Sequence, residues 1–131
     1  MENKICLDTD FLVDFLRNGD EEVEFIKDNE IKTELATTYI NLFELYYGAY
    51  KSERRDENLK LINQLIGRIS LINLSDDSAE AAGKISAMLE KQGALVEFRD
   101  ILIGAMALVN GYAVKTKNIK HFENIKELKV L

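Results

Sequence analysis

The sequence predicts an α/β fold in which helices cover both faces of a central, mostly parallel sheet of four to five strands. Short apolar runs that are typical of buried strands alternate along the chain with longer segments of helical periodicity. The 131 residues are 47% hydrophobic, which is enough for the core of one domain. Because the chain has no proline, no Gly/Ser linker and no internal repeat, we expect a single domain over residues 1–131.

The first half of the chain begins with an apolar run at 4–7 that predicts a buried strand. Asp10 is a good N-cap for the helix that follows, which would stop at Asn18 and Gly19. Further along we expect a helix over 21–28, a strand over 34–37, a helix that begins at Thr37 or Thr38 and runs through Ala49, a charged turn over 51–57, and a helix over 59–67.

The second half continues the alternation with a strand over 69–74 and a helix from Ser75 to about Gln92. Residues 98–110 are apolar on nearly all sides, which predicts a central helix that Gly111 ends. A fourth strand is expected over 112–115, and a fifth is expected over 128–131.

The single cysteine, Cys6, lies inside the first apolar run and has no partner for an internal disulfide. This use of cysteine indicates a reducing compartment, and no signal-peptide pattern precedes Asp8. The longest uncharged apolar run, 101–109, is too short to span a bilayer. We therefore expect a cytoplasmic protein with no membrane partner.

Three acids stand where a doubly wound sheet would expose a site. Asp8 ends the first strand, and ligands bind at the carboxyl ends of strands in such folds, although a turn or capping role is the alternative. Glu44 lies on a narrow polar stripe of an otherwise apolar helix, where it either faces solvent or lines a cleft. Asp100 opens the central helix, where the helix dipole alone would also favour an acid.

Carboxylates that converge within a few Å repel one another, and such a cluster is stable mainly when a divalent cation neutralises it. The three acids would offer only oxygen ligands, which favours Mg²⁺ or Mn²⁺ over zinc. The only histidine, His121, cannot form a zinc site alone. Asp10 is more readily explained as a helix cap, from which it would help to orient Asp8.

Three segments resemble motifs of the PIN-domain ribonucleases. LDTDFLVDFL resembles the opening motif of that family, and INLFELYYGA resembles its second motif, an apolar helix that contains one Glu. RDILIGAMALVNGYAVKTKNIKHF resembles the third and fourth motifs, in which an Asp opens a small-residue helix and a strand leads to a Thr-x-Asn segment. The order and spacing match over nearly the whole chain, and its size is similar to that of the VapC-like toxins of toxin–antitoxin systems.

The resemblance implies a PIN-like fold and an endoribonuclease that cleaves RNA with Mg²⁺- or Mn²⁺-activated water. Asp8, Glu44 and Asp100 would be the catalytic metal ligands, and Thr116 would lie near them. Where Asp10 stands the family often has Asn, which supports its capping role.

The last motif departs from the family, which usually has a further acid there, often just before the Phe. Here His121 stands before Phe122, and Asn118 is an amide. This departure lowers the negative charge of the site and weakens the case for a second metal ion. Asn118 and His121 would then lie around the site without ligating the metal as acids.

The resemblance also implies an RNA substrate, a cognate antitoxin protein that reaches the acidic site, and a homodimer. The net charge of −6 gives no overall attraction to nucleic acid, so RNA binding would need a local basic patch. The candidates are Lys115, Lys117 and Lys120 beside the site, and Lys51, Arg54, Arg55 and Lys60 after the Glu44 helix. Arg99, next to Asp100, is placed to pair either with a carboxylate or with the C-terminal carboxylate of a partner.

Two other functions stay open on the sequence. A phospho-acceptor receiver domain also carries acids after its first strand and binds Mg²⁺, but it needs an adjacent acid pair, which Thr9 splits here. A PIN fold that binds RNA or protein without cleaving is the second alternative, and the missing last acid favours it.

Overall fold

The computed structural model describes residues 3–131, in which four parallel strands form one sheet. The strands are β1 (Lys4–Leu7), β2 (Glu34–Thr38), β3 (Ser70–Ile72) and β4 (Ala113–Lys115), in the order β3-β2-β1-β4. β1 lies inside the sheet, paired in parallel with β2 on one side and with β4 on the other. The predicted parallel sheet is confirmed. Its order differs from the 2-1-3-4-5 order of receiver domains, which removes that alternative.

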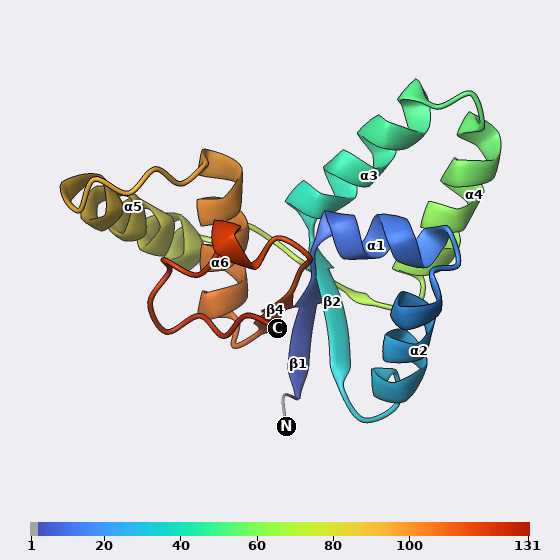
Figure 1. The fold of residues 1–131 in the computed structure, drawn as a ribbon, viewed down its shortest axis with the longest axis horizontal. Coiled ribbons are helices and arrows are strands. Elements are labelled where there is room, and N and C mark those ends of the chain that lie inside the picture. Colours follow the sequence, from blue (N-terminus) through green and yellow to red (C-terminus); the bar gives the residue numbers. More distant parts are fainter. Residues whose placement is uncertain (1–2) are drawn as a thin grey trace.

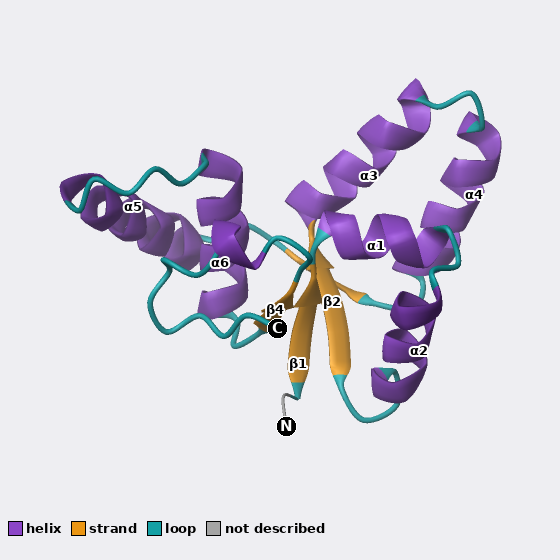
Figure 2. Ribbon diagram, viewed as in Figure 1, coloured by secondary structure: helices purple, strands orange, loops and turns teal. Residues whose placement is uncertain are grey.

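Within the described residues, six α-helices cover the two faces of this sheet (Figures 1 and 2). Four of them lie on one side of the strands and two on the other, and a short 3₁₀ helix follows β4. The first group is α1 (Thr9–Leu16), α2 (Asp20–Asn29), α3 (Tyr39–Lys51) and α4 (Arg55–Ile66); the second is α5 (Asp76–Lys91) and α6 (Phe98–Val109), with η1 (Ile119–His121) after β4.

Successive residues of the inner strands point to opposite faces of the sheet and feed two separate cores. Ile5, Leu7 and Leu35 pack with residues of α1 to α4. Cys6 and Ala36 pack with residues of α6 and of the C-terminal segment. This alternation follows from the two-residue period of a strand. A strand that is buried on both faces must be apolar throughout, which is why the sequence marks β1 so clearly.

The first helix begins earlier than the sequence predicts, because Asp8 is its N-cap. The Asp8 carboxylate accepts a hydrogen bond from the backbone N–H of Thr9, and Asp10 lies in the first helical turn. The prediction that Asp10 is the N-cap is therefore wrong. Both acids suit the strand–helix junction locally, so the residues of the junction alone do not distinguish them.

Three further boundaries differ from the expected ones. α4 begins at Arg55, inside the predicted charged turn, and β3 is confined to three residues. Near the C-terminus, Val130 forms a single parallel bridge with Val114, so the expected fifth strand is an isolated bridge. The expected cap at Ser75 is confirmed, and Gly111 follows α6 with a positive φ of 79°.

The central helix α6 is buried along most of its length, as its composition predicts. It contacts α5 on one side and the C-terminal segment on another. Gly104 permits the second contact, because a Cβ atom at that position would lie 2.4 Å from Cδ1 of the buried Ile125. In the part of the chain described here, no helix is both long enough and apolar enough to cross a membrane.

We expect Gly104→Ala to lower the free energy of unfolding by about 1–3 kcal/mol, because Ile125 must move to admit the methyl group. Gly83→Ala is the matched control in α5, where an added Cβ meets nothing within 4 Å. It should raise the free energy of unfolding by about 0.5–1 kcal/mol through helix propensity. Urea unfolding followed by circular dichroism measures both, and equal shifts in the two variants would contradict the close packing of α6.

Candidate active site

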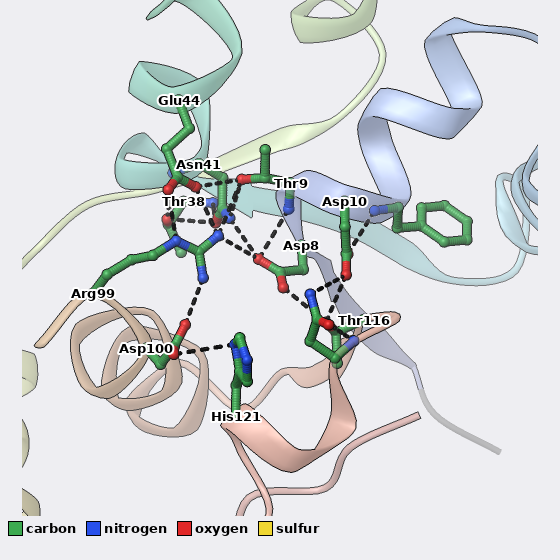
Figure 3. A network of polar contacts seen from close by, with 12 residues as sticks. Asp8, Thr9, Asp10, Thr38, Asn41, Glu44, Arg99, Asp100, Thr116 and His121 are labelled. Atoms are coloured by element: carbon green, nitrogen blue, oxygen red, sulfur yellow. Dashed lines mark hydrogen bonds and ion pairs between the residues drawn. The ribbon is translucent and has the colours of Figure 1, made fainter. Parts of the chain in front are cut away.

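The polar side chains at the carboxyl edge of the sheet come from three neighbouring strands. Asp8 directly follows β1, Thr38 ends β2, and Thr116 directly follows β4. Parallel strands place their carboxyl ends at one edge, so residues more than a hundred positions apart in sequence become neighbours. Thr116 Oγ1 donates a hydrogen bond to Asp8 Oδ2 at 2.7 Å (Figure 3).

Asp8 lies at the centre of this edge and is only 2% exposed. Its Oδ1 accepts hydrogen bonds from the backbone N–H of Thr9 at 2.9 Å and from Asn41 Nδ2 at 3.0 Å. Together with Thr116 on Oδ2, these donors satisfy both oxygens of the carboxylate. A buried charge is expensive unless it is fully hydrogen-bonded, and these partners offset that cost.

Glu44 and Asp100 approach Asp8 from helices on opposite sides of the sheet. Glu44 lies on α3, and Asp100 lies in the first turn of α6 with its side chain only 3% exposed. Thr9 Oγ1 donates to Glu44 Oε1 at 2.5 Å, which ties α3 to the start of α1. The three acids selected from the sequence therefore face one region, as Figure 3 shows.

The Arg99 guanidinium lies among these acids and contacts all of them. Nε and Nη2 bind the two oxygens of Glu44 at 2.6 and 2.7 Å. Nη2 also reaches Asp8 Oδ1 at 3.0 Å, and Nη1 reaches Asp100 Oδ1 at 2.5 Å. The expectation that Arg99 pairs with a carboxylate is confirmed, and it pairs with three. A single cation thus organises acidic groups from β1, α3 and α6.

Burial and charge shift the proton affinities in this cluster. Burial raises the pKa of Asp100, and the hydrogen bond and charge of Arg99 oppose that shift. Burial likewise raises the pKa of Asp10, and the negative charge of Asp8 adds to it. For Arg99, burial alone would lower the pKa, but the hydrogen bond with Glu44 and the charges of Asp8 and Glu44 raise it instead. The guanidinium therefore remains charged at neutral pH.

The donor set fits a hard divalent cation, because it consists of carboxylate oxygens that already surround a positive charge. In this structure the positive charge is the Arg99 guanidinium. In residues 3–131, no three Asp, Glu, His or Cys side chains are yet arranged to hold a metal directly. Burial raises the pKa of the Cys6 thiol to about 12, so this group is neutral at pH 7 and supplies no ligand.

Asp10 and Asn118 form a second polar group beside Asp8. Asp10 Oδ2 accepts hydrogen bonds from Asn118 Nδ2 at 2.9 Å and from the backbone N–H of Lys117 at 3.0 Å. These contacts fasten the loop after β4 to the first turn of α1. Asn118 therefore lies near the site, as expected, but its amide contacts Asp10 and not the carboxylates around Arg99.

His121 approaches the cluster from η1, with Nδ1 3.3 Å from Asp100 Oδ2. Its side chain is 49% exposed, so the imidazole links the buried acid to solvent. The sequence analysis did not select Thr9 and Asn41 as site residues. Asn41 is fully buried and forms a capping box with Thr38 at the start of α3. A capping box can be recognised from adjacent residues, but the hydrogen bond from Asn41 to the distant Asp8 cannot.

A model of the PIN-domain family matches residues 5–128. Ribonuclease VapC2 of Haemophilus influenzae is 30% identical over 126 residues, which cover 96% of this chain and 95% of the relative. The chain is a PIN-domain protein of the VapC family. The tRNA(fMet)-specific endonuclease VapC of Salmonella typhimurium is 29% identical, with 97% of this chain and 96% of that protein covered.

Solved structures of the VapC family share the fold over almost the whole chain. The VapBC2 complex of Rickettsia felis, bound to a DNA fragment from its promoter, contains a chain with a TM-score of 0.91 and 25% identity. That match covers 98% of this chain and 97% of the other. The DNA-bound VapBC complex of Salmonella typhimurium matches with a TM-score of 0.88, 28% identity, and coverage of 100% and 98%. The expected PIN-like fold is confirmed.

We expect Asn41→Asp to lower the free energy of unfolding by about 2–4 kcal/mol without divalent ions. The change removes the Nδ2 donor to Asp8 and Thr9 and adds a buried like charge. Asn63→Asp is the matched control, because the exposed Asn63 only accepts from Tyr46 Oη, which a carboxylate also does. Urea unfolding at pH 7 measures both, and a neutral Asn41→Asp change would mean that Asn41 does not support Asp8.

Proposed function

We propose that this VapC-type endoribonuclease hydrolyses an RNA phosphodiester with water activated by Mg²⁺ or Mn²⁺. Asp8, Glu44 and Asp100 would hold the ion. The observation that carries the proposal is their convergence on one positive charge, from a strand end and two separate helices. When bound, the ion would supply a water of lowered pKa and neutralise charge that develops on the scissile phosphate.

The remaining polar residues would hold this arrangement in place. Asn41 and Thr116 keep the Asp8 carboxylate oriented, each through a hydrogen bond to a different oxygen. Asp10 and Asn118 fix the loop that carries Thr116. His121, half-exposed beside Asp100, is placed to pass a proton to a departing oxygen. Since Asn118 and His121 replace the further acid of the family, one ion is the simpler assignment.

RNA binding would rely on exchange of ion pairs at the surface. In the patch beside the site, Lys117 Nζ contacts Asp14 and Glu22, and Lys115 lies over the Phe25 ring. The second basic cluster is likewise paired, for example Arg54 with Glu57. The exposed pair of Arg54 with Glu57 contributes little stability, so a phosphate would displace the acid there, whereas Lys117 also pairs with the nearly buried Glu22 and is held more firmly. Phosphate contacts of these side chains would weaken steeply with salt.

A groove beside Glu44 supports the proposal of an antitoxin partner. It lies between α1, α3 and α4, has a volume of about 180 Å³, and is lined mainly by apolar residues such as Val13, Leu16 and Leu45. A pocket of this size takes one or two apolar side chains of a bound segment. Its polar end at Glu44 would bring the bound segment to the acidic site. The structural relatives named VapBC are themselves toxin–antitoxin complexes.

A homodimer and a cytoplasmic location also remain proposals. The face of α3 that carries Phe43, Tyr47 and Tyr50 is largely exposed, and exposed aromatic side chains are typical of interfaces. The buried, unpaired Cys6 suits a reducing compartment.

A non-cleaving, RNA- or protein-binding PIN module is the alternative, and a specific observation favours it: Arg99 already neutralises part of the acid cluster. A protein of that kind would bind its partner without hydrolysis. It would also do so equally well in EDTA.

The proposed function predicts RNA cleavage that requires Mg²⁺ or Mn²⁺ and stops in EDTA. Asp8→Asn and Asp100→Asn should each lower the cleavage rate by about 100-fold or more, because each removes a charged ligand. The purified variants are incubated with an RNA panel and the products are separated on denaturing gels. Circular dichroism verifies that each variant is folded.

Asp28→Asn is the matched control, since Asp28 lies exposed near the end of α2, outside the acidic cluster and both basic patches. Its cleavage rate should equal that of the unmodified chain. Cleavage that persists in EDTA, or in both site variants, would reject the metal-dependent mechanism. Metal-independent RNA binding without any product would favour the non-cleaving alternative.

A further inference from the structure

Arg99 forms ion pairs with three acids at once, whereas an ordinary ion pair joins one cation to one acid. Its guanidinium binds Glu44 through two nitrogens and reaches Asp8 and Asp100 through the outer nitrogens, at 2.5–3.0 Å. A forked contact to a carboxylate is among the strongest hydrogen-bond arrangements. The side chain is nevertheless 27% exposed, so it lies at the mouth of the site and not deep inside it.

Arg99 already holds four oxygens of the three acids that are proposed to bind the metal ion. They are Oδ1 of Asp8, Oδ1 of Asp100 and both carboxylate oxygens of Glu44. Mg²⁺ binds oxygen at about 2.0–2.1 Å, which is much shorter than the nitrogen–oxygen distances of the guanidinium contacts. The carboxylates would have to close around the ion, and the guanidinium stands in the space through which they would move.

Charge opposes joint occupancy as well. A divalent ion and a guanidinium a few Å apart repel each other, most strongly where water is partly excluded. The frame that holds Asp8 does not depend on Arg99, because Thr9, Asn41 and Thr116 donate to it independently. If the guanidinium moved away, the Asp8 carboxylate would therefore keep its position and could bind the ion.

From these contacts we infer that Arg99 is a built-in competitor of the metal ion: it occupies the acidic site when no ion is bound and must leave before the ion binds. Arg99 thus sets the metal affinity of this protein. The inference rests on the proposed metal-dependent function. It assigns to Arg99 the role of lowering metal affinity, which differs from the role of the three acids that would bind the ion.

The competition has a measurable size. If the site is open in only a small fraction of molecules, the apparent dissociation constant rises by the inverse of that fraction. A site that is open about 1–10% of the time would bind the ion about 10- to 100-fold more weakly than a variant without the guanidinium.

The test measures Mn²⁺ binding to the full chain by electron paramagnetic resonance, in the absence of RNA. Arg99→Gln should bind Mn²⁺ about tenfold more tightly or better. Arg68→Gln is the matched control, because Arg68 pairs with Glu30 away from the site, and its affinity should equal that of the unmodified chain. Arg99→Lys, which keeps one charge but not the fork, should lie between the two and provides a variant with a partly neutralised cluster if Arg99→Gln does not fold.

A second measurement follows displacement in the unmodified chain. The Nε–H signal of Arg99, identified by its absence in Arg99→Lys, should shift in the nuclear magnetic resonance spectrum as Mg²⁺ is added. Unchanged or weaker Mn²⁺ binding by Arg99→Gln, or an unmoved Arg99 signal while Mg²⁺ binds, overturns the competition and leaves the proposed function intact. If neither protein binds Mn²⁺ at millimolar concentration, the metal-dependent function fails together with the inference.

Discussion

The buried carboxylate of Asp8 is the constraint on which the rest of the site depends. A charge at the end of an interior strand is stable only if donors surround it, and here they come from four different parts of the chain. Each donor fixes the place of its own element: Thr9 the start of α1, Asn41 that of α3, Arg99 that of α6, and Thr116 the loop after β4. The contacts that join these elements at the carboxyl edge are therefore also the contacts that form the site.

The packing of α6 on the sheet face opposite α1 to α4 determines the position of Asp100 relative to Asp8. α6 is held between α5 and the C-terminal segment, and the absence of a side chain at Gly104 lets Ile125 pack directly on the helix. The same packing aims the first turn of α6 at the carboxyl edge. Asp100 and Arg99 are consequently delivered as a pair, an acid and its neutralising cation from adjacent positions of one helix.

Local features of the fold could be predicted from the sequence, because their causes are local. The strand at β1, the cap at Ser75 and the stop at Gly111 each follow from a few adjacent residues. The choice between Asp8 and Asp10 as N-cap could not be predicted, since both acids suit the junction between strand and helix locally. The expected fifth strand over 128–131 is a single bridge, because strand propensity does not show how many residues find a hydrogen-bonding partner on a neighbouring strand.

The site could be predicted only in part for the same physical reason. The surroundings of Asp8, Glu44 and Asp100 left a structural role open for each, and the resemblance to the PIN-domain motifs selected them. In the structure all three converge on Arg99. The multiple contacts of Arg99 depend on the distance between α3 and α6, which no sequence pattern carries. The role of Asn41 could not be predicted, because its hydrogen bond to Asp8 depends on how α3 lies against the end of β1.

The balance of charge at this edge links the fold to the chemistry. Three carboxylates outnumber the one guanidinium among them, in a chain whose net charge is already −6, so a phosphate that approaches the edge meets excess negative charge. A divalent ion in the same place offsets more of that charge than a guanidinium does. The displaced arginine, still tethered beside Asp100, would then add a donor near the incoming anion. The arrangement that stabilises the protein without metal would thus also repel the proposed substrate, and the proposed exchange of the guanidinium for a divalent ion would weaken that repulsion.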